Sequence, residues 1–144
     1  MKSTYFDERQ IQLRGQIFLH GYVLALTLIL LNAFLQDNGI VWADPFYQNL
    51  LIFVASITLV SIEFIVRGVY FGQRKTPWPQ IYLFGALSLV LTFFCLNDLI
   101  QGAALVENTG LSDRGAVLVF DAMFIATALV ALIHTVRERR KNKD

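Results

Sequence analysis

The chain has 144 residues, of which 56% are hydrophobic and 16% charged, and its formal net charge is +1. A soluble domain carries about a quarter charged residues, so this composition excludes an ordinary soluble domain and indicates an integral membrane protein. The single cysteine, Cys95, excludes an internal disulfide, a CxxC redox pair and a cysteine-rich metal site. The length fits one domain.

The chain begins with a polar segment, residues 1–16, in which a few hydrophobic side chains are interspersed. We expect a short juxtamembrane helix there, lying on the cytoplasmic surface. The first membrane span is expected at residues 17–35, and it ends without the small-residue cleavage site of a signal peptide. A loop from Asp37 to Asn49 follows, with Pro45 and aromatic side chains that suit the membrane interface.

The second span, residues 50–71, carries an acid and a base among its apolar side chains, Glu63 and Arg67. At about 1.5 Å per residue, a helix of this length reaches roughly 33 Å and can cross a hydrocarbon core of about 30 Å. Each charge costs about 2.5–3.5 kcal/mol at a span centre. The spacing of four residues with the acid first predicts that the two side chains pair on one helix face.

Two further spans are expected at residues 81–100 and 116–136, followed by a basic tail at residues 137–144. In the polar loop between these spans, Ser112 or Asp113 is placed to cap the last helix. The sequence therefore predicts an all-α membrane protein, in which four antiparallel transmembrane helices form a bundle over residues 17–136.

The distribution of basic residues predicts the orientation. In the expected layout, eleven of the twelve lysines and arginines fall on one side, and the other side has only Arg114. By the positive-inside rule, both termini are expected in the cytoplasm of a bacterial cell, with the spans in its plasma membrane.

Small and polar residues at helical spacing are expected to mark the helix-packing faces, because lipid supplies no apolar driving force between helices. On the fourth span, Thr127, Ala131 and Thr135 share one face, and we expect this face to be the contact of a homodimer or a larger homo-oligomer. The third span has a similar face, formed by Gly85, Ser88 and Thr92.

Depth sorts the polar and ionisable residues of the spans into two candidate clusters. The inner cluster consists of His20, Glu63 and Arg67, and the outer cluster consists of Asn32, Asn97, Asp98 and Asp121. In the outer cluster, Asp98 and Asp121 belong to consecutive antiparallel helices, so their carboxylates could face each other.

Three interpretations of these groups stay open. In the first, Glu63 and Arg67 neutralise each other, and the outer acids reach water. In the second, Glu63 is a proton or cation carrier whose carboxylate is desolvated. In the third, Glu63 or Asp121 pairs with another chain. Neither a metal site nor a cofactor motif is predicted, and the basic tail suits anionic lipid rather than nucleic acid.

The opening Asp7-Glu8-Arg9-Gln10, followed by Arg14, resembles a family of small bacterial membrane proteins of unknown function that open with Asp-Glu-Arg. The step from Arg67 to Gly68 is similar as well. The resemblance implies a four-span protein and no activity. We therefore expect a non-enzymatic accessory or regulatory protein that acts through helix contacts with itself or a partner. The alternative is a small proton- or cation-linked transporter that uses Glu63.

Overall fold

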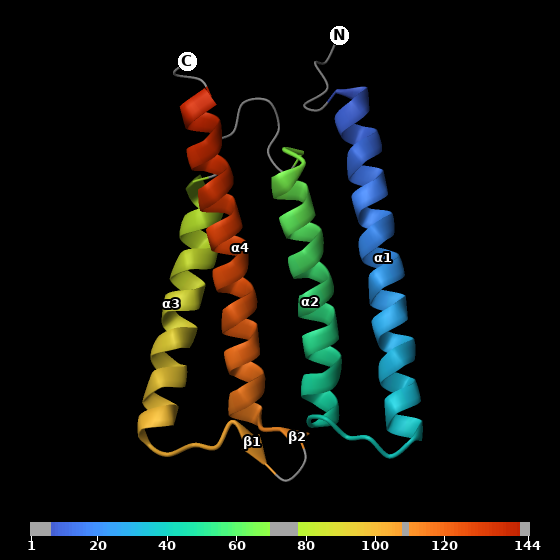
Figure 1. Cartoon of the computed structure of the whole chain (residues 1–144), viewed down its shortest axis with the longest axis vertical. Coiled ribbons are helices and arrows are strands. Elements are labelled where there is room, and N and C mark those ends of the chain that lie inside the picture. Colours follow the sequence, from blue (N-terminus) through green and yellow to red (C-terminus); the bar gives the residue numbers. More distant parts are fainter. Residues whose placement is uncertain (1–6, 70–77, 108–109, 142–144) are drawn as a thin grey trace.

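The computed structural model of the chain describes residues 7–69, 78–107 and 110–141. These ranges contain two short strands and four long helices, each helix long and apolar enough to cross a membrane (Figure 1). The predicted all-α four-helix bundle is confirmed, and the chain is a small multi-pass membrane protein. The elements are α1 (Glu8–Asp37), α2 (Pro45–Val66), α3 (Trp78–Ile100), β1 (Val106–Glu107), β2 (Gly110–Leu111) and α4 (Asp113–Lys141).

Some of the predictions fall outside the described residues. Residues 1–6 of the juxtamembrane segment, residues 70–71 of the expected second span and residues 142–144 of the tail are among them. So are four of the basic residues used for the orientation, Lys2, Arg74, Lys75 and Lys143.

The juxtamembrane segment differs from the prediction where it is described. From Glu8 onward it is the first part of α1, which runs without a break to Asp37. Asp7 caps the start of this helix by accepting a hydrogen bond from the backbone N–H of Gln10 at 2.6 Å. Residues 8–16 are mostly good helix formers without a proline, so nothing in them ends a helix before the span begins. The described part of the basic tail is also helical, because α4 continues past the expected end of the last span to Lys141.

The second helix lies about five residues earlier in the chain than predicted. It begins at Pro45, with Asp44 as N-cap accepting from the backbone N–H of Phe46, so the end of the expected loop is helical. It ends at Val66, because Gly68 takes a positive φ of 67° and starts a helix-ending turn. The N–H of Gly68 then bonds to the carbonyl of the third residue before it, and the next N–H bonds to that of Phe64. Arg67 is thus the C-cap of α2 rather than a residue inside the span.

The four helices form a row. α1 packs on α2, α2 packs also on α4, and α4 packs on α3, so α1 and α3 are the edge helices (Figure 1). The central pair, α2 and α4, runs in the same direction. Buried hydrophobic side chains gather in two places, around Ile17 and Phe64 between α1 and α2, and around Leu51 and Phe120 between α2 and α4. The remaining helix surfaces are covered with exposed leucine, isoleucine, valine and phenylalanine, as contact with lipid requires.

The α1–α2 loop and the α3–α4 loop lie at the same end of the bundle, which we call the outer end, and these outer loops are joined to each other. β1 and β2 form a short antiparallel pair, and a parallel bridge joins Ala43 of the first loop to Leu111 of β2. The backbone N–H of Leu111 donates to the carbonyl of Trp42 at 2.7 Å. Ser112 caps α4, as predicted, because its Oγ accepts from the N–H of Gly115. These bonds fix the α1–α2 loop against the start of α4.

Candidate functional site

Near the end of the α1–α2 contact at which α2 ends, the structure brings together His20, Glu63 and Arg67. One guanidinium nitrogen of Arg67 lies 2.7 Å from Glu63 Oε1, and His20 Nδ1 lies 3.1 Å from the same oxygen and 3.2 Å from Oε2. The Glu63 carboxylate therefore has a basic partner on its own helix and another on α1. We call these three residues the inner triad.

The inner triad is part of the protein surface rather than of the core. The side chain of His20 is 57% exposed, that of Arg67 39% and that of Glu63 25%. α2 ends earlier than predicted, so Glu63 lies only three residues before its last residue. The distance along the helix axis from Glu63 to that end is about 5 Å. The triad thus lies near one end of the bundle, where an ionic group costs less than at the centre.

A second basic residue joins the two helices beside the inner triad. Arg14 donates to the backbone carbonyl of Val69 at 3.0 Å, and its guanidinium carbon lies 5.2 Å from the ring centroid of Phe64. Arg14 is one of the basic residues that predict the membrane orientation and is part of the family resemblance. This contact was not predicted from the sequence. The length of α1 beyond the end of α2 is what allows Arg14 to reach Val69.

The residues of the predicted outer cluster are divided between two places in the structure. Asp98 forms an ion pair with Arg114, at the start of α4. Asp121 accepts a hydrogen bond from Thr92, and Asn32 accepts one from the indole of Trp42. The side chain of Asn97 is exposed. Asp98 and Asp121 both belong to the α3–α4 contact, where each has its own partner, whereas Asn32 lies on α1.

The buried carboxylate of Asp121 joins α3 to α4. Its residue is 3% exposed, and Thr92 Oγ1 donates to its Oδ2 at 2.6 Å. The other oxygen, Oδ1, is buried and has no hydrogen-bond partner among the described residues. A buried polar atom without a partner is costly, so the single bond from Thr92 is important for holding this side chain.

We expect Thr92→Val to lower the free energy of unfolding by about 1 kcal/mol, because it removes the only hydroxyl that bonds to Asp121 among the described residues. Thermal unfolding in detergent, followed by circular dichroism, measures the change. Thr27→Val is the matched control, since Thr27 bonds to the carbonyl of Val23 in its own helix. An equal loss in both variants would show that the contact with Asp121 contributes nothing.

The predicted packing faces are used within the chain. Ser88, Thr127, Ala131 and Thr135 are all buried, and Ala131 is 1% exposed. The expectation that the Thr127, Ala131 and Thr135 face forms a homodimer contact is therefore wrong, because α4 already has helices on two sides. A close approach between α1 and α2 occurs at Gly21, where an added Cβ would lie 2.2 Å from a methyl group of Val60.

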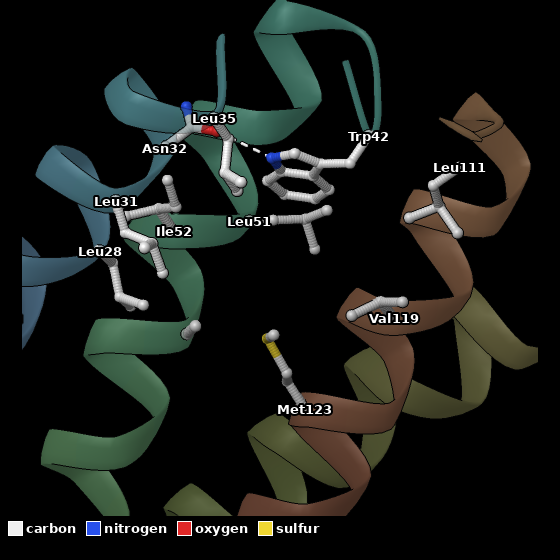
Figure 2. Close-up of a pocket in the computed structure, with 11 residues that line it drawn as sticks. Leu28, Leu31, Asn32, Leu35, Trp42, Leu51, Ile52, Leu111, Val119 and Met123 are labelled. Carbon is white, nitrogen blue, oxygen red and sulfur yellow. Dashed lines mark hydrogen bonds between the residues drawn. The ribbon is translucent and has the colours of Figure 1, made fainter. Parts of the chain in front are cut away.

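An apolar pocket of about 410 Å³ lies on the face of α2 between α1 and α4 (Figure 2). Its walls include Leu28 of α1, Ala55 of α2 and Met123 of α4. The ring of Trp42 and the side chain of Leu111, both from the joined outer loops, close its outer end. We call this cavity the outer pocket. Sequence analysis did not predict it, because it depends on the order of the helices.

Within the described ranges, no three histidine, cysteine, aspartate or glutamate side chains come together in a way that could hold a metal ion. Comparisons of the chain with protein-family models, with curated proteins and with solved structures found no match.

Proposed function

We propose that this protein is a non-enzymatic accessory protein of a bacterial plasma membrane that works by binding a transmembrane helix of another membrane protein. The observation that carries the proposal is the inner triad, which presents a half-exposed imidazole on the surface of an edge helix. Polar groups on the membrane-facing surface of a helix favour a partner that can hydrogen-bond to them. The resemblance to small four-span bacterial proteins that open with Asp-Glu-Arg is part of this proposal.

The docking surface that we propose is the face of α1 that carries His20 and Thr27. These two residues are seven apart, so they lie on one face two turns from each other, and both are exposed. His20 uses Nδ1 for Glu63, so Nε2 is the ring nitrogen that we propose for the contact with a partner. Because two of the three triad residues are basic, the partner helix is expected to carry a carboxylate or an amide oxygen at the depth of His20.

The alternative function, a proton- or cation-linked carrier, requires a carboxylate that can exchange its bound ion. Glu63 is engaged by both Arg67 and His20. This double pairing supports a role in helix contacts more than a role as carrier. We also infer that both termini are cytoplasmic, since the described ends of α1 and α4 lie at the same end of the bundle with most of the basic residues (Figure 1). A cytoplasm-specific reporter fused after Asp144 tests the orientation and should be active.

A photocrosslinking amino acid at position 27, in the full chain in its native membrane, tests the docking surface. We expect a discrete adduct with another membrane protein, identified by mass spectrometry, whose yield falls about three- to tenfold when His20→Leu is added. The control places the crosslinker at position 29, a similarly deep position on the opposite face of α1, where Ile29 is exposed.

Three results would contradict the proposal. Equal adducts at positions 27 and 29 would show unspecific contact. An adduct of this chain with itself alone would assign the face to a second copy. Proton- or cation-dependent flux in proteoliposomes that Glu63→Gln abolishes would favour the carrier.

A further inference from the structure

We propose that the outer pocket is a binding site for a hydrocarbon chain of a membrane lipid. The inference does not depend on the function proposed above, because neither His20 nor Thr27 lines the outer pocket and the ligand is of another class. Its basis is the shape of the pocket, the chemistry of its walls and the way in which its outer end is closed.

The walls indicate an apolar ligand. Two side chains among those lining the pocket carry strongly polar groups, and these are bonded to each other: Trp42 Nε1 donates to Asn32 Oδ1 at 2.8 Å. A ligand therefore gains little from a polar group at these positions. The volume of about 410 Å³ is within the range of ligand pockets in proteins, about 300–1,000 Å³.

The closed outer end decides between a lipid chain and a transmembrane helix. Trp42 and Leu111 lie across that end (Figure 2), and the loops that hold them are fixed by the bond between the Leu111 N–H and the Trp42 carbonyl. A helix crossing the whole membrane in this position would collide with these loops. A flexible hydrocarbon chain can end beneath them.

The expected position of the pocket in the membrane places it in contact with lipid chains. The pocket lies along three helices that are each long and apolar enough to span, so bilayer hydrocarbon surrounds it at high concentration. A chain on an open helix surface is in contact with protein on one side, whereas a chain in the outer pocket meets α1, α2, α4 and the ring of Trp42. The additional van der Waals contacts favour retention there. Met123, an adaptable side chain, points into the cavity in Figure 2.

Trp42 itself can report binding, because the chain has two tryptophans and Trp78→Phe leaves Trp42 alone. The full-length variant is reconstituted in phosphatidylcholine vesicles that contain increasing amounts of phosphatidylcholine with brominated acyl chains, which quench tryptophan fluorescence on contact. A second protein, with Trp42→Phe, Trp78→Phe and Phe94→Trp, reports ordinary surrounding lipid, since Phe94 is exposed and lies six residues from the outer end of α3.

We expect half-maximal quenching of Trp42 at a brominated fraction about tenfold lower than for the Phe94→Trp probe. Ala55→Phe, which fills the pocket from α2, should remove this difference, and Val119→Phe fills it from α4 if the first variant does not fold. Ala86→Phe is the matched control, because Ala86 lines a different groove, between α3 and α4, and should leave the quenching unchanged. Addition of a polyprenyl alcohol distinguishes the source of the chain: relief of quenching assigns the site to isoprenoids, and no relief assigns it to acyl chains.

Equal quenching curves for Trp42 and the Phe94→Trp probe would overturn the proposal, since the pocket would then hold lipid no better than an open surface. The proposal would also be overturned if the folded Ala55→Phe and Val119→Phe variants still reached half-maximal quenching of Trp42 at the low brominated-lipid fraction. The quencher would then contact Trp42 from outside the pocket.

Discussion

Replacing Gly115 with alanine is expected to destabilise the protein by about 2–3 kcal/mol. An added Cβ at this position would lie 2.2 Å from the backbone oxygen of Leu105 and 2.7 Å from a methyl group of Leu111. The Leu105 oxygen accepts the backbone N–H of Ser112, so the loop cannot yield without losing this bond. The joined outer loops should separate from α4, and Trp42 should lose its closed position over the outer pocket.

Thermal unfolding in detergent and the fluorescence emission of Trp42, measured in the Trp78→Phe background, test this expectation. Gly85→Ala is the matched control, because an added Cβ there meets nothing within 4 Å. In a helix interior, alanine is more favourable than glycine by about 0.5–1 kcal/mol, so the control is expected to gain stability. If Gly115→Ala and Gly85→Ala were equally stable and the emission of Trp42 were unchanged in both, the loop would not depend on the close approach at Gly115.

The second large effect is expected at the inner triad. Glu63→Gln should cost about 2 kcal/mol, because it removes the carboxylate that is bonded to both Arg67 and His20. Arg67→Gln should cost about 1 kcal/mol, since His20 stays beside Glu63 and the Arg67 side chain is partly exposed. The double variant should lose less than the sum of the two, with a coupling energy of about 1 kcal/mol.

Melting temperatures of the unmodified protein, the two single variants and the double variant in detergent complete a double-mutant cycle and give this coupling energy. The Asp98–Arg114 pair at the outer end is the comparison, and its more exposed arginine, at 59%, predicts a smaller coupling for Asp98→Asn with Arg114→Gln. Strictly additive losses at Glu63 and Arg67 would show that their pairing adds nothing. A Glu63→Gln variant as stable as the unmodified protein would argue instead for a carboxylate free to act as a carrier.

Several features of the fold follow from local sequence. Some of them were predicted, and others were missed although the sequence signals them. Four long apolar runs predict four spans, and the part of the chain that the structure describes has four such helices. A cap at Ser112 or Asp113 was predicted from their position before the last run, and the structure has it at Ser112. The start of α2 was missed, although Asp44 followed by Pro45 is a typical helix start. Its end was missed as well, although Gly68 is the residue type expected just after a helix.

The proximity of His20, Glu63 and Arg67 could also be anticipated, because helical spacing and depth place all three at one level. The partners at the outer level could not. Thr92 bonds to Asp121, Arg114 to Asp98 and Trp42 to Asn32, and each pair depends on which helices or loops are neighbours. The outer pocket depends on the same choice.

By itself, then, the sequence determined the number of helices, their membrane character and the residues that share each helix face, since these follow from apolar length and a period of 3.6 residues. Only the tertiary structure decided the order α1, α2, α4, α3 and, with it, that Ala131 is buried within the chain instead of facing a second copy. The physical reason is that hydrocarbon solvates an apolar helix face about as well as another helix does. Helix neighbours are therefore selected by close packing, such as that at Gly21, and by single hydrogen bonds, such as that of Thr92, and neither is visible in one helix alone.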